Sequence, residues 1–237
     1  MKEVNSYGWK AVIGSSIGYA MDGFDLLILG FMLTLISGDL GLTTGQAGSL
    51  VTWTLVGAVL GGFIFGTLSD KFGRVRVLTW TIVLFAIFTG LCAFAQGYWD
   101  LLIYRTIAGI GLGGEFGIGM ALAAEAWPAQ HRAKATSYVA IGWQLGVLAA
   151  ALLTPLLIPI IGWRGMFMVG IIPALIAWVF RAKLHEPEIF VQSKEDKEHS
   201  HTNSFKLLVK DVRTTKTSIG VAILTSVQNF GYYGIMI

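Results

Sequence analysis

The sequence has few charged residues and almost no cysteine. Only 13% of its 237 residues are charged and 54% are hydrophobic, whereas about 25% of the residues of a soluble domain are charged. So few charges would leave the surface of a soluble domain largely uncovered, but a lipid bilayer needs no such cover. The single cysteine, Cys92, excludes an intramolecular disulfide, and the sequence has no Cys–His cluster with metal-ligand spacing. We therefore expect no metal and no cofactor.

Long apolar runs dominate the chain instead. A bilayer is crossed by a helix of roughly 17–25 apolar residues, and helix is the expected state because a single segment in lipid must satisfy its own backbone hydrogen bonds. The first run contains two aspartates and is too long for a signal peptide, so we expect it to be retained. The sequence predicts an all-α membrane protein with six spans, at 11–36, 48–68, 75–95, 101–125, 135–160 and 165–181.

These spans divide the chain into three predicted parts. Residues 1–181 form a bundle of six transmembrane helices, and residues 218–237 begin a seventh. The segment 182–217 between them is a linker, because its polar stretch of mixed charge cannot bury enough apolar surface to order itself.

The lysines and arginines predict the topology. Fifteen of the 17 fall on one side of the predicted spans, in the N-terminal segment, the second and fourth loops and the linker. The positive-inside rule places that side, and with it the N-terminus, in the cytoplasm, and we expect the protein in the cell (inner) membrane. Because topology accounts for the basic residues, we do not expect nucleic-acid binding.

Four ionisable residues lie well inside the spans: Asp22, Asp25, Arg105 and Glu115. An ionisable group inside a membrane is costly, so it is a functional hypothesis by default. Asp22 and Asp25 are three residues apart and share a helix face. Two carboxylates this close repel each other, so at least one is expected to hold a proton near neutral pH. We predict proton coupling at these two residues. Asp25 is the one placed to pair with Arg105, and a static ion pair is the alternative.

The loop GTLSDKFGRVR at 66–76 carries the second signal. Gly66 allows close approach of helices, and Gly73 permits a left-handed backbone between two helices. Asp70 can accept from an arginine or a helix N-terminus, while Arg74 holds the loop on the anionic cytoplasmic face. On their own these residues could form a merely charged loop, and it is the family resemblance described next that implies a loop gating a conformational change.

Five motifs, taken in their order along the chain, resemble those of the major facilitator superfamily. The loop is similar to the signature between helices two and three, and an arginine followed by spaced glycines is similar to the helix-four signature. A Glu-x-x-Pro-x-x-x-Arg element and two short motifs also match; the segments are 66–76, 105–115, 125–133, 162–164 and 184–188. The resemblance implies two six-helix halves with substrate bound between them at mid-membrane. This chain would then be the six-helix N-terminal bundle plus the start of helix seven, with a C-terminal half expected as its partner.

Other motifs narrow the resemblance. MDGFD at 21–25 is similar to the helix-one motif of organic acid/proton symporters, and GLGGEFG at 111–117 and EAWP at 125–128 look most like sialic acid symporters. Aromatic-acid and nicotinate carriers share much of this pattern. The resemblance implies a secondary active transporter, not an enzyme, that moves a small organic anion such as sialate together with protons by alternating access.

The same resemblance suggests the groups that touch substrate. Arg105 and Glu115 are candidates within the bundle, and Gln228, Asn229 and Tyr232 are candidates at the opening of the second half. The polar and aromatic residues near 228–233 are equally typical of an interfacial belt. A half-size or inactive membrane fragment, and a sugar or metabolite facilitator, remain alternatives. Substrate identity and the choice between proton and sodium stay open.

Overall fold

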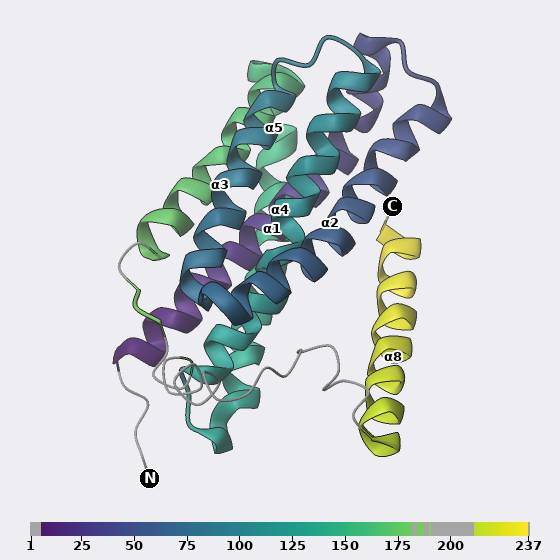
Figure 1. Cartoon of the computed structure of the whole chain (residues 1–237). Coiled ribbons are helices and arrows are strands. Elements are labelled where there is room, and N and C mark those ends of the chain that lie inside the picture. The colour runs from purple at the N-terminus through teal and green to yellow at the C-terminus, as the bar shows by residue number, and fades with distance from the viewer. Residues whose placement is uncertain (1–5, 182–183, 187–189, 191–210, 237) are drawn as a thin grey trace. The chain divides into compact units, whose positions relative to one another are not determined.

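The computed structural model describes residues 6–181, 184–186, 190 and 211–236, and of residues 229, 230 and 232–236 only the backbone. The chain forms two compact units, residues 1–190 and 191–237. All regular structure in the described residues is helical (Figure 1). The prediction of an all-α membrane fold is confirmed. The first unit contains α1 (Ser6–Leu40), α2 (Thr44–Phe72), α3 (Arg74–Cys92), α4 (Tyr98–Glu125), a short 3-10 helix (Ala129–His131) and α5 (Arg132–Arg181).

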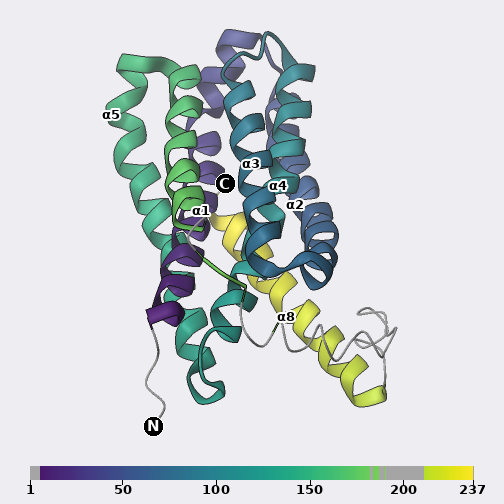
Figure 2. The ribbon, with the colours of Figure 1, turned by 60° about the vertical axis from the view of Figure 1, so that its left-hand side comes forward.

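Helix α5 consists of two limbs. Gly162 has φ 65° and ψ −177°, which is not helical, and the chain turns back there so that the limbs run side by side (Figure 2). This conformation favours glycine, because a side chain is strained at positive φ. The helices α1 to α5 are each long and apolar enough to cross a membrane. With α5 supplying two limbs, they account for the six predicted apolar segments.

The second unit contains α8 (Val212–Met236). This helix begins within the predicted linker, six residues before the expected start of a seventh span. Among the described residues α8 is not one of the helices apolar enough to count as a membrane span. Its first turns carry Arg213, Lys216 and several threonines. The division at 181 and 217 stays a prediction.

Glycines bring the helices of the bundle into backbone contact. A Cβ at Gly61 of α2 would overlap the backbone of α4, and a Cβ at Gly113 of α4 would overlap the backbone of α2. Gly142 and Gly146 of α5 meet the backbone of α1 in the same way. Small residues spaced by four are how membrane helices approach closely. The closest of these contacts join α2 with α4 and α1 with α5, and Gly111 of α4 also meets the backbone of α3.

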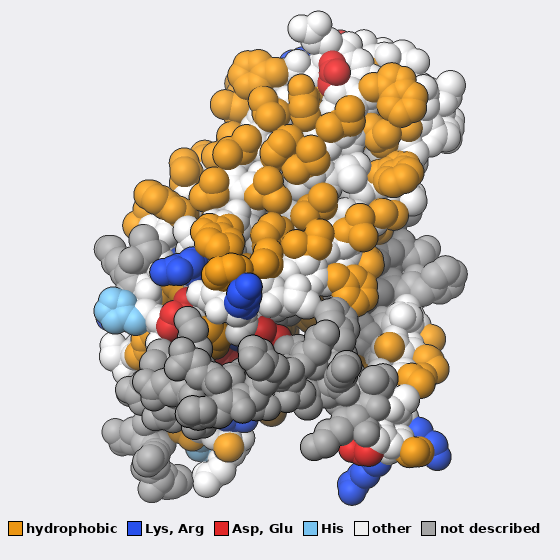
Figure 3. Space-filling view, viewed as in Figure 1, with side chains coloured by type: hydrophobic (Ala, Val, Ile, Leu, Met, Phe, Trp, Pro, Cys, Tyr) orange, Lys and Arg blue, Asp and Glu red, His pale blue; other side chains and the backbone are white. Residues whose placement is uncertain are grey.

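The outer surface of the bundle is apolar. Figure 3 shows hydrophobic side chains over most of the visible face of α2 to α4, with lysines and arginines toward one end. Large hydrophobic residues such as Phe63, Ile87 and Ile103 are exposed there. Such a surface suits contact with lipid, whereas it would be a liability in water.

Candidate functional site

Five charged side chains are buried among the described residues of the bundle. Four are the predicted residues Asp22, Asp25, Arg105 and Glu115, and the fifth is Arg181. The structure brings these residues together where α1, α4 and the end of α5 meet. They form two ion pairs and leave one carboxyl group without a partner.

Arg105 and Asp25 form the first pair. Nη1 and Nη2 of Arg105 donate to the two carboxylate oxygens of Asp25 at 3.0 Å and 2.8 Å, and both side chains are at most 1% exposed. Arg105 Nε also donates to Thr54 Oγ1 at 3.4 Å, and its guanidinium lies 5.8 Å from the ring centre of Phe167. This parallel two-point contact is the geometry in which arginine binds a carboxylate most strongly.

Glu115 and Arg181 form the second pair. Arg181 Nη1 and Nη2 lie 2.8 Å and 2.7 Å from the two oxygens of Glu115. Thr81 of α3 donates its hydroxyl to Glu115 at 2.6 Å. Arg181 also donates to the backbone carbonyls of Leu78 and Gly14. Glu115, predicted to bind substrate, is therefore held by side chains of two other helices, α3 and α5.

Asp22 has no comparable contact. Its side chain is 1% exposed, and neither carboxylate oxygen has a hydrogen-bond partner in the described part of the chain. The charges that act most strongly on it are those of Glu115, Arg181 and Asp25. Asp22 lies between the two ion pairs along α1, since Asp25 is one turn further along and the Glu115–Arg181 pair lies against Gly18, one turn before.

The loop between α2 and α3 carries a third charged cluster. Arg74 donates to Asp70 at 2.6 Å, to Ser69 at 2.7 Å and to Glu125 at 3.2 Å. The last of these bonds ties the loop to the end of α4, and all three acceptors are at least partly shielded. Asp70 and Arg74 thus contact each other as the loop motif suggested, and their gating role stays a prediction.

The two predicted glycines of this loop, Gly66 and Gly73, differ in their structural roles. Gly73 has φ 110° between α2 and α3, the positive value that the sequence suggested. A Cβ at Gly66 would meet no atom of the described residues within 4 Å, so among them Gly66 is not a point of close helix contact. The Glu186 carboxylate accepts the backbone N–H groups of Arg74, Val75 and Arg76, and so caps the first turn of α3.

The predicted residues of the second unit are placed less fully. Gln228 lies in α8 and is exposed. Asn229 and Tyr232 belong to the same helix, but their side chains lie outside the described residues. Their part in binding substrate stays a prediction.

Arg181 is the residue that sequence reasoning placed wrongly. We counted it among the cytoplasmic loop residues because it follows an apolar run and precedes a basic linker. It is 1% exposed and bonded to Glu115. The unpaired intramembrane Glu115 was the one available signal, because a buried carboxylate needs a basic partner.

Comparison with known proteins places this geometry in a family. Residues 15–237 match the model of the Major Facilitator Superfamily. A Haemophilus influenzae protein, named for metabolite transport without a stated substrate, is 75% identical over 99% of this chain and 59% of its own length. The cis,cis-muconate transport protein of Acinetobacter baylyi is 34% identical over 98% of this chain and 57% of its own.

A solved structure agrees in fold. The xylose transporter XylE from E. coli, in a partially occluded inward open conformation, superimposes with a TM-score of 0.72 at 24% identity, over 82% of this chain and 52% of that one. The chain belongs to the major facilitator superfamily, whose members are membrane transporters and not enzymes. It spans between half and three-fifths of the length of these relatives.

Proposed function

We propose that this chain belongs to a secondary active transporter that carries a small organic anion across the cell membrane together with protons. The observation that supports this most is the pair of Arg105 and Asp25, which is fully buried and bonded at two points. A buried arginine facing a titratable carboxyl group is the chemistry that links binding of an anion to binding of a proton.

The coupling follows from competition for the guanidinium. A substrate carboxylate needs the same two N–H groups of Arg105 that Asp25 now occupies. Protonation removes the negative charge of Asp25 and weakens its hold on Arg105. The substrate carboxylate then takes the vacated place, so the buried site keeps a neutral balance in both states. Because an uncompensated buried charge is strongly unfavourable, anion and proton are bound together.

The names of the relatives support a carboxylate substrate. They include the sialic acid transporter NanX of Escherichia coli, at 32% identity, and a niacin transporter of Acinetobacter baylyi, at 34%. Sialate, muconates and aromatic acids all carry a carboxyl group for Arg105 to bind. The likeness to a xylose carrier concerns the fold, and a sugar facilitator is the weaker alternative because a neutral sugar does not require a buried arginine.

The topology and the partner belong to the same proposal. The N-terminus would lie in the cytoplasm, a topology that the basic residues at one end of the bundle support. In carriers of this fold the substrate site lies between two six-helix halves, so we propose that a second bundle completes the site opposite Asp25 and Arg105. The α2–α3 loop, with Asp70 bonded to Arg74, would then separate and re-form its contacts as the carrier changes direction.

Uptake measurements test the proposal. Cells that express the protein as its gene encodes it are given labelled sialate, cis,cis-muconate, benzoate or nicotinate at acidic and at neutral external pH. We expect one of these acids to enter faster at acidic pH, and Asp25→Asn and Arg105→Gln to abolish that uptake. Arg164→Gln, at an arginine outside the pair, is the matched control and should retain it. Uptake that persists in Arg105→Gln would contradict the proposed role of the pair.

A further inference from the structure

Charge balance in the buried site calls for one proton. The buried acids are Asp22, Asp25 and Glu115, and the buried bases are Arg105 and Arg181. Arg105 is bonded at two points to Asp25, and Arg181 is joined to Glu115 by one hydrogen bond and a second ion-pair contact, which leaves Asp22 as the third acid. An isolated carboxylate in a dry interior is so unfavourable that the group is neutralised instead. Asp22 therefore holds a proton in this state.

Asp22 lies near the Glu115–Arg181 pair as well as near the Asp25–Arg105 pair. Gly18 is four residues before Asp22, on the same face of α1 and about 6 Å along the helix axis. A Cβ at Gly18 would overlap both Arg181 and Glu115. Only a glycine lets α1 lie this close to the pair, and Arg181 reaches the Gly14 carbonyl one turn further.

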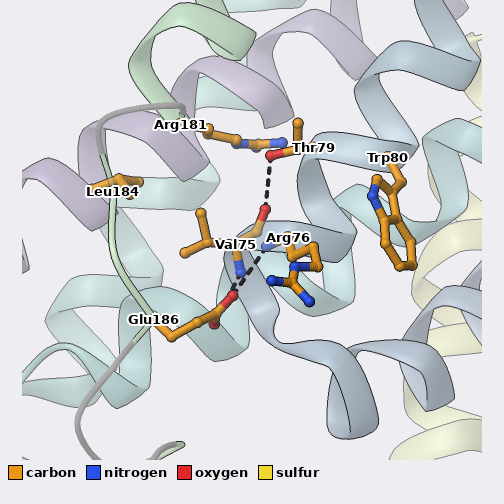
Figure 4. Close-up of a pocket in the computed structure, with 7 residues that line it drawn as sticks. All are labelled: Val75, Arg76, Thr79, Trp80, Arg181, Leu184 and Glu186. Atoms are coloured by element: carbon orange, nitrogen blue, oxygen red, sulfur yellow. Dashed lines mark hydrogen bonds between the residues drawn. The ribbon is translucent and has the colours of Figure 1, made fainter.

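A pocket at the surface borders this region at Arg181. It has a volume of about 320 Å³ and is lined by Val75, Arg76, Thr79, Trp80, Arg181, Leu184 and Glu186. Figure 4 shows Arg181 at one end of the pocket and Glu186 at the other, with the first turns of α3 between them. Arg181 thus contacts Glu115 on its buried side and borders the pocket. The pocket lies at the end of the bundle that carries the basic loops.

We propose that Asp22, Glu115 and Arg181 form a second proton-binding centre, separate from the anion-binding pair, which exchanges its proton with the cytoplasm through this pocket. The inference rests on the proposed function for its purpose, but its chemistry does not depend on substrate. Glu115 is thereby assigned to the proton and not to the substrate, and Arg181 is the positioning residue.

The exchange keeps the charge balanced. In the observed arrangement Asp22 is neutral, Glu115 is negative and Arg181 is positive. Transfer of the proton from Asp22 to Glu115 breaks the O–H bond of one carboxyl group and forms that of the other. Arg181 then turns from Glu115 to the newly ionised Asp22, so the centre remains neutral. Release of the Glu115 proton toward the pocket is offset by uptake of a proton at Asp22 from the opposite side, and the return of Arg181 to Glu115 restores the first state.

All charged groups that face this centre take part in the balance. Asp25 and Arg105, from α1 and α4, neutralise each other on one side. Arg76 and Glu186 border the pocket on the other. From α3, Thr81 contributes only a hydroxyl group, which donates to Glu115. Arg181 is therefore the group whose position decides which of the two carboxyl groups is ionised.

Infrared spectroscopy of the protein in lipid vesicles tests the proposal without any substrate. A protonated carboxyl group gives a carbonyl band that shifts in D₂O. We expect such a band at neutral pH, its loss in Asp22→Asn, and its retention in the control Asp211→Asn, at an exposed carboxylate. Arg181→Gln should add a second band, because Glu115 then has no base and takes up a proton. If Arg181→Gln does not fold, the double variant Glu115→Gln/Arg181→Gln removes both charges and should keep the single band.

Two results would overturn the proposal. One is a band that survives in Asp22→Asn, and the other is an unchanged number of bands in Arg181→Gln. For the pocket, Thr79→Phe should slow the exchange of the band after transfer to D₂O, and an unchanged rate would exclude this route. No anion is added in these experiments, so a negative result would not affect the proposal for Arg105 and Asp25. Conversely, a negative uptake test would not change the infrared bands expected here.

Discussion

Two aspartates one turn apart on α1 should lose very different amounts of stability on the same substitution to asparagine. Asp25→Asn removes the charge that balances Arg105, which stays buried and positive. If Asp22 is protonated as proposed, Asp22→Asn replaces a neutral carboxyl group by a neutral amide of the same size, at a position where neither oxygen is bonded to a described residue. The two variants are matched in chemistry, helix and depth, so their difference isolates the effect of the ion pair.

The expected magnitudes follow from burial and geometry. The Asp25–Arg105 pair has two hydrogen bonds, at 3.0 Å and 2.8 Å, between side chains that are at most 1% exposed. Removal of one partner of such a pair lowers the free energy of unfolding by roughly 3–5 kcal/mol. Asp22→Asn should change it by about 1 kcal/mol or less, the net value of an ordinary hydrogen bond. The double variant Asp25→Asn/Arg105→Gln should recover much of the loss.

Denaturant unfolding in detergent micelles, followed by circular dichroism, measures these differences. A linear dependence of unfolding free energy on denaturant allows extrapolation and comparison of variants. Equal effects of Asp25→Asn and Asp22→Asn would refute the reasoning, because they would mean that Arg105 is balanced by another group or that Asp22 is charged. Additive effects of Asp25→Asn and Arg105→Gln would refute it as well, since the two residues would then not be coupled.

Three further predictions concern packing, capping and pH. Gly113→Leu should cost about 1–3 kcal/mol or more, because the side chain overlaps the backbone of α2; Gly117→Leu, where a Cβ meets nothing within 4 Å, should cost little in the same unfolding assay. Glu186→Gln should lower unfolding free energy by about 1 kcal/mol, because the α3 N-terminus loses its negative charge; an unchanged value would show that the amide caps equally well. The pKa of Asp211 is lowered by hydrogen bonds from Thr214 at the start of α8. A lowered pKa means that this cap is present above the ordinary range of an aspartate and is lost as pH falls through the lowered pKa. The amide chemical shift of Thr214 should therefore move in acid, and should not move in Asp211→Asn.

The sequence was enough to predict those features of the site that depend only on position along one helix. The positions of Asp25 and Arg105 in the membrane follow from the rise of a helix. For Asp25, Arg105 was the one basic residue that the sequence reading placed inside a span. The positive φ of Gly73 follows from a short turn between two helices. These inferences need local geometry and no knowledge of which helix faces meet.

The remaining part depends on contacts between distant segments. Arg181 ends an apolar run, and a basic residue in that place is typical of a cytoplasmic anchor. Only the packing of α5 against α1 and α4 turns it inward to Glu115. Glu186 is similar, because its role as a cap depends on α3, more than a hundred residues earlier. Periodicity shows which residues form helices, but not which of them face one another.

The glycine contacts have a mechanical consequence for the bundle. Where backbones touch, no layer of side chains is left to rearrange, so α2 with α4 and α1 with α5 should each move as a stiff helix pair. Both buried ion pairs connect one helix pair to the other, from Asp25 of α1 to Arg105 of α4 and from Arg181 of α5 to Glu115 of α4. Across the boundary between the two helix pairs, the helices meet through side chains, in buried apolar clusters and in these two ion pairs. Under the proposed coupling, a single proton would weaken the charged contacts of this boundary, whereas it would leave the glycine-packed backbones unchanged.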